Sequence, residues 1–310
     1  MELLSSNLFG YVKGAFTGAY GTSKGLLEAA DGGMLFLDEV HRLNNESQEK
    51  LFIFLDQGIF RRMGESGGGI RQKLGSSWLP QKVSVLNQCR YLAEQADAVV
   101  ISPEYRLAPE TPFPGALDDV MGTLDWITEH TEELKIDEDK IAVMGESAGG
   151  TLAANCCLRD QKERIKLAVY IYGALDLTPA EKTPYHWDYS LYDMYEGQKD
   201  YIMNRLFRFK ELTDYMEDLY VQNGYSTMDG EVSPLYAEDL SKMPKTLMVE
   251  AEFGYFKIGN DEFIKRLTEA GIDTEVILYE GLDHGFFDRI GSLPQAEDCI
   301  REITERVKRL

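Results

Sequence analysis

From residue 88 onward, short runs of apolar residues alternate with segments in which apolar positions recur at helical spacing. Continuous apolar runs indicate strands that are buried on both faces. The predicted strands are 98–102, 140–144, 167–173, 246–251 and 274–280. The predicted helices are 87–96, 117–134, 151–160, 261–270 and 294–309. This alternation predicts an α/β fold with a mostly parallel sheet covered by helices on both faces.

Residues 178–236 break the alternation. The segment is rich in Tyr, Trp, Phe and Met, and it predicts a mostly helical insertion between two strands. Two interpretations stay open. The aromatic residues form a small core of their own, or they belong to a cap that lines a substrate pocket.

The first 69 residues have a different composition. Glycine-rich turns surround one strongly apolar predicted strand, MLFLDEV at 34–40, and a predicted helix follows it. The run GESGGG at 64–69 is typical of a junction. We therefore predict two domains, residues 1–69 and residues 70–310.

Charge and composition narrow the function classes. The formal net charge is −21, and residues 1–69 contribute −3 of it, from 6 Lys and Arg against 9 Asp and Glu. Such a field repels a phosphate backbone, so nucleic-acid binding is not expected.

The four cysteines form no C-x-x-C motif, so neither a disulfide framework nor a metal site is predicted. No apolar run reaches the roughly 18 residues of a membrane helix, and the sequence shows no leader peptide. We expect a cytoplasmic protein without membrane attachment.

Two stretches contain G-x-S-x-G, around Ser66 and Ser147. A nucleophile on such a turn needs a strand before the serine and a helix after it. Ser147 has both, whereas Ser66 has neither; the alternative for Ser147 is an ordinary strand–turn–helix corner. The N–H of Ala148 would then face a developing oxyanion. GESGGG is not a phosphate loop either, because Ile70 and Arg71 stand where Lys and Ser or Thr are required.

The base is sought among four histidines. His284 follows the last predicted strand and precedes the last helix, which is the position expected for the base when a serine nucleophile comes first in the chain. His130 lies in a polar turn and is interpreted as a surface residue. His41 and His186 are interpreted as structural.

Residues 88–310 resemble the hormone-sensitive-lipase-like family of α/β-hydrolase carboxylesterases. The resemblance rests on YRLAPETPFPGALDD (105–119), GESAGG (145–150), VSPLYAEDL (232–240) and LDHGFF (282–287). It implies an α/β-hydrolase fold and hydrolysis of short- to medium-chain carboxylic esters without a cofactor. Ser147 would attack the carbonyl, His284 would accept and return the proton, and an acid would orient His284.

The sequence departs from this family at two site positions. Gly254 stands where the family has its catalytic Asp. Glu252 and Asp261 are the two substitutes considered, and Glu252 is preferred; a solvent-facing Glu252 at a strand end is the alternative. At the oxyanion loop H-G-G-G, the chain has Ser66 followed by glycines. Gly67 and Gly68 are candidate oxyanion donors, or else a coincidental match at the junction.

The first strands of the family's sheet are also missing from the sequence. The strand that leads into the oxyanion loop would lie between 98–102 and 140–144, so its loss leaves an open gap in the sheet. Residues 34–40 form the N-terminal run that is apolar enough to fill it. We state this as a hypothesis.

Residues 1–66 resemble a slice of the bacterial enhancer-binding AAA+ ATPases, which remodel polymerase carrying the nitrogen-type sigma factor. GAFTGA at 14–19 corresponds to the sigma-contacting loop of that family, and GGMLFLDE to its Walker B strand. The resemblance places Asp38 at the Mg²⁺-binding position and Glu39 at the water-activating position. No P-loop precedes them in this sequence, so we interpret the slice as an ATPase remnant fused near residues 64–75 to the hydrolase part.

The sequence therefore favours a carboxylic ester hydrolase that acts on a small-molecule ester, and it leaves the level of activity undecided. Two rivals stay open, a fragmentary sigma-dependent transcription regulator and an inactive hydrolase scaffold. Acyl length and oligomeric state are left undecided.

Overall fold

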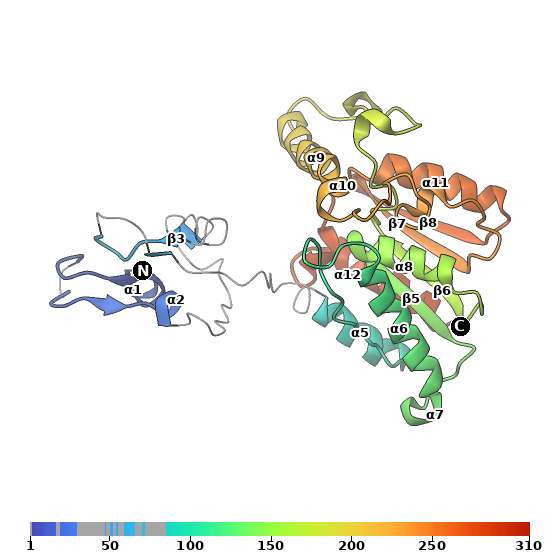
Figure 1. Ribbon diagram of the computed structural model, residues 1–310, viewed down its shortest axis with the longest axis horizontal. Coiled ribbons are helices and arrows are strands. Elements are labelled where there is room, and N and C mark those ends of the chain that lie inside the picture. The colour runs from blue at the N-terminus through green and yellow to red at the C-terminus, as the bar shows by residue number, and fades with distance from the viewer. Residues whose placement is uncertain are drawn as a thin grey trace. The chain divides into compact units, whose positions relative to one another are not determined.

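The structure is a computed structural model, and it describes residues 2–16, 19–29, 47, 50, 51, 54, 59–65, 70, 71 and 85–310. The chain forms two compact units, Met1–Leu79 and Pro80–Leu310. Figure 1 labels helices and strands of each unit.

The N-terminal unit is built from short elements. These are helix α1 (Glu2–Phe9), strands β1 (Gly10–Tyr11) and β2 (Ser23–Lys24), helix α2 (Leu26–Ala29), and strands β3 (Ile59–Phe60) and β4 (Ile70–Arg71). β1 pairs antiparallel with β2, and β3 with β4. A small apolar core joins the described helices to β3 through Leu8, Phe9, Leu27, Leu51, Phe54 and Phe60.

The C-terminal unit contains a four-stranded parallel sheet in the order β5–β6–β7–β8 (Figure 1). The strands are β5 (Ile141–Glu146), β6 (Ile165–Ile171), β7 (Lys245–Phe253) and β8 (Thr274–Asp283). Because all four run in one direction, their carboxyl ends meet at one edge of the sheet, where α/β folds place their sites.

Helices cover both faces of this sheet. Alternate side chains of β6 point to opposite faces: Leu167, Val169 and Ile171 join the core under α5 and α12, whereas Ala168 and Tyr170 join the core under α6, α8 and α11. The helices are α5 (Leu86–Ala96), α6 (Gly115–Glu129), α8 (Ala148–Arg159), α11 (Lys257–Glu269) and α12 (Pro294–Val307). The predicted three-layer α/β arrangement is confirmed.

Two predicted elements differ from the structure. The single helix predicted over 117–134 is divided at His130 into α6 and a short α7 (Thr131–Leu134). Residues 98–102 form no strand, although they are apolar. A strand needs a ladder partner, and β5 pairs with β6 alone among the described strands, so nothing in the described chain supplies the second edge. Val99 is 51% exposed as a result. Residues 34–40, the predicted filler of this gap, lie outside the described residues.

The insertion over 178–236 is helical in part. It contains α9 (Lys199–Asp214), α10 (Met216–Leu219) and the 3-10 turns Ala180–Lys182, Tyr189–Leu191 and Pro234–Tyr236. Trp187 and Tyr192 are buried in a cluster with Phe253, the last residue of β7, and with Tyr255 and Phe256, which follow it. The aromatic residues of the insertion thus share a core with residues at the carboxyl edge of the sheet.

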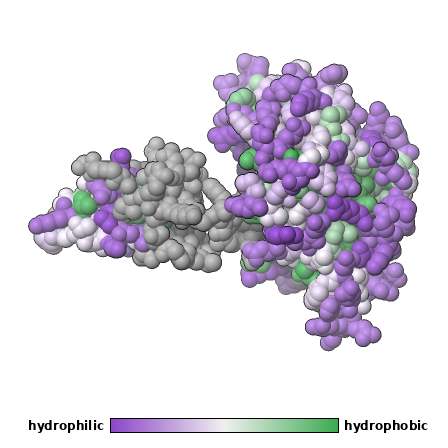
Figure 2. Space-filling view, viewed as in Figure 1, coloured by the Kyte–Doolittle hydropathy of each residue, from purple (hydrophilic) through white to green (hydrophobic). Residues whose placement is uncertain are grey.

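The visible surface of this unit is mostly hydrophilic, with scattered apolar residues (Figure 2). Within the described residues, no helix has the length and apolar character required to span a bilayer.

Candidate active site

Ser147 stands on a sharp turn between β5 and α8. Its φ of 51° and ψ of −120° are unusual for a residue with a side chain. Main-chain hydrogen bonds hold the turn in place, from Ser147 N to Ile171 O at 3.0 Å and from Ala174 N to Ser147 O at 3.0 Å. The strained backbone is therefore fixed from β6, at the carboxyl edge of the sheet.

Two glycines make this turn possible. A Cβ at Gly145 would overlap the carbonyl oxygen of Gly149, and a Cβ at Gly150 would lie 2.6 Å from Cα of Gly173. A Cβ at Gly149 would meet nothing within 4 Å. The tight approach thus requires the first and last glycines of GESAGG, and not Gly149.

Ala148 is the first residue of α8. The first N–H groups of a helix have no intrahelical acceptor and carry the positive end of the helix dipole. The Ala148 N–H therefore has the location required of an oxyanion donor. The other two predicted donors, Gly67 and Gly68, lie outside the described residues.

His284 reaches Ser147 across 137 residues of sequence. It directly follows β8, and its Nε2 lies 2.7 Å from Oγ of Ser147. Gly285 follows with a φ of 86°, which turns the chain into the 3-10 turn Phe286–Arg289. The two side chains lie within hydrogen-bond reach, the distance that direct proton transfer requires.

Aromatic rings enclose the imidazole of His284. Its ring centroid lies 4.4 Å from that of Phe209, 4.6 Å from Tyr172 and 5.6 Å from Phe256. Burial among these rings disfavours the imidazolium and, together with the positive charge of Arg205, lowers the pKa of His284 to about 3. His284 is therefore a neutral hydrogen-bond acceptor or donor over the physiological pH range.

The Nδ1 atom of His284 has no hydrogen-bond partner among the described residues, although it is buried. The prediction that Glu252 orients this atom is corrected by the structure. Glu252 lies at a ladder irregularity between Ala251 and Phe253, and its carboxylate accepts the Gly281 N–H at 2.5 Å. The second substitute, Asp261, forms an ion pair with Lys257 at 2.6 Å on α11. Neither carboxylate orients His284.

Arg205 and Tyr172 were not predicted as neighbours of the pair, whereas Phe209 is one of the aromatic residues of the insertion for which a cap was one of the two interpretations. Arg205 and Phe209 on α9 contact His284, and their spacing of four residues is the sequence signal for a shared helix face. Tyr172 donates to Glu146 at 2.7 Å beneath the turn. Burial and the nearby Asp288 raise the pKa of Glu146 to about 7, so this carboxyl retains a proton near neutrality.

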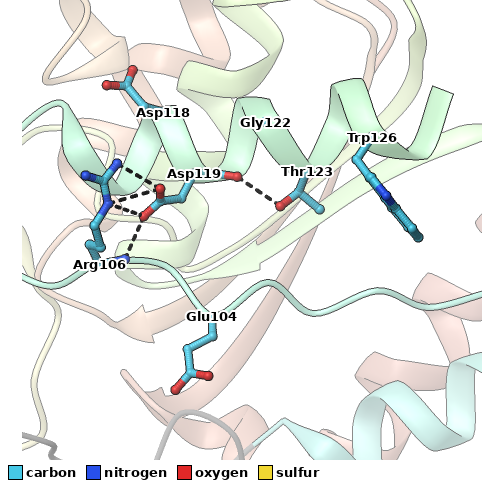
Figure 3. A pocket seen from close by; sticks show the side chains of 7 residues that line it. All are labelled: Glu104, Arg106, Asp118, Asp119, Gly122, Thr123 and Trp126. Atoms are coloured by element: carbon cyan, nitrogen blue, oxygen red, sulfur yellow. Dashed lines mark hydrogen bonds and ion pairs between the residues drawn. The ribbon is translucent and has the colours of Figure 1, made fainter. Parts of the chain in front are cut away.

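A cavity of about 470 Å³ lies elsewhere, beside α6 (Figure 3). Figure 3 shows Arg106 turned toward Asp119, and the shortest ion-pair distance between them is 2.8 Å. Trp126 projects from α6 at a position further along the helix than this pair (Figure 3). Neither Ser147 nor His284 lines the cavity. Its cation is already paired with Asp119, and the Ser147–His284 pair lies outside this cavity.

Comparisons with known proteins agree with this geometry. Residues 75–288 match the alpha/beta hydrolase fold family, and residues 1–71 match the sigma-54 interaction domain. An arylesterase of Saccharolobus solfataricus is 31% identical over 215 residues, which cover 68% of this chain and 66% of that protein. The chain thus spans just under two thirds of this relative's length. The esterase structure of Pyrobaculum calidifontis is 28% identical with a TM-score of 0.62, over 72% of this chain and 70% of that one.

The N-terminal part has relatives of another kind. The transcriptional regulatory protein DagR of Salmonella typhimurium is 63% identical over 65 residues, which are 21% of this chain and 7% of that protein. The match thus covers a small slice of a much longer regulator. The chain belongs to the alpha/beta hydrolase fold family, and a fragment of a sigma-54 interaction domain precedes its hydrolase part.

Proposed function

We propose that the protein is a carboxylic ester hydrolase that acts on short- to medium-chain esters, with Ser147 as nucleophile and His284 as base. The observation that carries the proposal is the 2.7 Å separation of Ser147 Oγ from His284 Nε2, on a strained strand-to-helix turn. A serine hydroxyl is a weak nucleophile unless a base removes its proton, and His284 supplies that base.

The reaction follows from this arrangement. Oγ of Ser147 attacks the ester carbonyl carbon while Nε2 of His284 accepts the hydroxyl proton. The carbonyl oxygen becomes an oxyanion that the Ala148 N–H stabilises. The imidazolium then donates its proton to the leaving alcohol oxygen, which gives an acyl-serine. A water molecule, deprotonated by His284, releases the acid and restores Ser147.

The unpartnered Nδ1 of His284 bears on the rate. Loss of the orienting carboxylate in a Ser-His-Asp triad costs on the order of 10⁴ in kcat. We therefore propose a slow esterase. An inactive scaffold is the alternative that the same observation favours.

The test is turnover of p-nitrophenyl acetate and butyrate by the full chain. Ser147→Ala is expected to remove the activity. Ser241→Ala is the matched control. Ser241 is exposed and precedes the amino end of β7, whereas Ser147 follows the carboxyl end of β5. Equal turnover by Ser147→Ala and wild type would refute the assignment of the nucleophile.

A second candidate function rests on the N-terminal part. GAFTGA at 14–19 lies within the sigma-54 match, so the fragment, taken as residues 1–69, is a candidate for sigma-factor contact. The rest of the chain, residues 70–310, is the proposed hydrolase domain and has no part in this second function. Capture of the sigma factor by the wild type, and its loss in Thr17→Ala, would support this function. Equal capture by both proteins would argue against contact through this loop.

A further inference from the structure

Helix α9 of the insertion presents three side chains to the loop that carries His284. Tyr201, Arg205 and Phe209 are spaced four residues apart, so they lie along one face of the helix. Each makes a contact with Asp283 or His284. This face of α9 thus brings a guanidinium and a hydroxyl group to the two consecutive residues Asp283 and His284.

Arg205 makes the most specific of these contacts. Its Nη2 donates to the carbonyl oxygen of His284 at 2.9 Å. Its Nε lies 2.9 Å from a carboxylate oxygen of Asp283, which makes an ion pair but no hydrogen bond. The planar guanidinium therefore spans two consecutive residues. This fixes the main chain of His284 from the side of the insertion.

Two further groups complete the anchoring. The carboxylate of Asp283 also lies 3.5 Å from a guanidinium nitrogen of Arg289, and it accepts a hydrogen bond from the hydroxyl of Tyr201 at 3.5 Å. Phe209 contributes the ring closest to the imidazole, with centroids 4.4 Å apart. The backbone and one ring face of His284 are thus both set by α9.

A histidine base ordinarily keeps its orientation through a hydrogen bond from Nδ1 to a carboxylate. His284 lacks such a partner among the described residues, yet its Nε2 points at Ser147. We infer that Arg205 is a positioning residue, through which α9 holds the base toward the nucleophile in place of an acid on Nδ1. This inference rests on the proposed esterase function.

The charge of Arg205 also acts on the base. The charged or titratable groups near His284 are Arg205, the Asp283–Arg289 pair, and the carboxyls of Glu146 and Asp288 below Tyr172. Of these, the positive charge of Arg205 is the one that lowers the pKa of His284, in addition to burial. Removal of that charge at constant packing should make His284 easier to protonate.

The experiment compares Arg205→Met, Arg205→Lys and the control Arg208→Met. Methionine keeps an aliphatic side chain but removes the charge and the hydrogen-bond donors. Lysine keeps the positive charge but lacks the planar guanidinium group that contacts both Asp283 and His284. Arg208 is an exposed arginine of the same helix. For Arg205→Met we expect kcat to fall on the order of 10- to 100-fold with KM little changed, because misplacement of a reacting group acts on the chemical step.

The pH dependence separates positioning from a merely structural role. In Arg205→Met the acid limb of kcat/KM should move up by about one pH unit. Arg205→Lys should keep the limb and recover part of kcat, and Arg208→Met should match wild type. A folded Arg205→Met protein with wild-type kcat, or with an unmoved acid limb, would overturn the inference.

Failure of the inference can be told apart from failure of the proposed function. The NMR titration of the His284 ring needs no turnover, and His284→Gln assigns its signal among four histidines. A wild-type protein without esterase activity refutes the proposed function. The ring chemical shifts report where the imidazole lies among its aromatic neighbours. Ring shifts and a titration that are both identical in wild type and Arg205→Met overturn the inference, whatever the activity.

Discussion

Gly254→Asp should increase the esterase activity. Phe253 on β7 is paired with Asp283 on β8, so Gly254 follows β7 level with His284. The φ of Gly254 is not in the left-handed region, and a Cβ there would meet Ala251 O at 3.2 Å as its nearest atom. An aspartate therefore fits after a shift of a few tenths of an ångström. Its carboxylate is expected to accept a hydrogen bond from Nδ1 of His284.

The size of the gain follows from what the carboxylate does. An orienting acid in a triad is worth on the order of 10⁴ in kcat, or about 5 kcal/mol of barrier. Because α9 already holds His284, we expect a smaller gain, on the order of 10²-fold. The new negative charge also favours the imidazolium, so the acid limb of the pH profile should move up from about 3 toward the ordinary value near 6.5.

The assay is kcat/KM for p-nitrophenyl butyrate across the acid and neutral pH range. Gly254→Asn is the matched control, because an amide fills the same space without the charge. It should give little or none of the gain and leave the acid limb in place. A folded Gly254→Asp protein that is no faster than Gly254→Asn would refute the reasoning about the missing acid.

Three further predictions concern stability. The pKa of His284 is about 3 in the folded protein and 6.5 when unperturbed, so the unfolded chain binds more protons than the folded one between these pH values. Urea unfolding should therefore show a free energy of unfolding that falls by up to about 5 kcal/mol from pH 6.5 to pH 3. His284→Gln should flatten this pH dependence. The pH dependence of Glu146 has the opposite sign, because burial and the neighbouring Asp288 raise its pKa; the stability that it contributes is therefore lost as pH rises from 4.5 toward 7. Glu146→Gln should be more stable than wild type above pH 7, and equal stability there would contradict the raised pKa. Gly150→Ala should lower the free energy of unfolding by about 1 to 3 kcal/mol, because the added Cβ clashes with Gly173. Gly149→Ala is the control and should not lower it, because a Cβ there meets nothing within 4 Å. Equal thermal midpoints for the two variants would show that the turn can relax.

The sequence was sufficient wherever local pattern and chain direction decide the structure. Continuous apolar runs predicted β5 to β8, since a strand buried on both faces has no polar alternation. Ser147 and His284 were paired because the serine lies between a strand and a helix and because the base is expected after the last strand; their side chains lie 2.7 Å apart at the carboxyl edge of the sheet. These are consequences of topology, so residues 137 apart could be paired in advance.

The failures depend on partners that a linear pattern does not reveal. Residues 98–102 have strand composition, but a strand also needs a neighbour, and the described part of the chain supplies none. Glu252 was close enough in sequence to serve as the acid, but the ladder irregularity turns its carboxylate to the Gly281 N–H. Arg205 was missed because its contact with His284 arises only when α9 packs onto the loop that carries His284.

The most direct test is to locate the site of covalent labelling by a fluorophosphonate probe in the intact protein. Such probes react with a serine hydroxyl that a neighbouring base activates. The account predicts that mass spectrometry finds the adduct on Ser147, and that His284→Gln suppresses the labelling while the protein stays folded. An unlabelled Ser147, or labelling that is indifferent to the loss of His284, would contradict it.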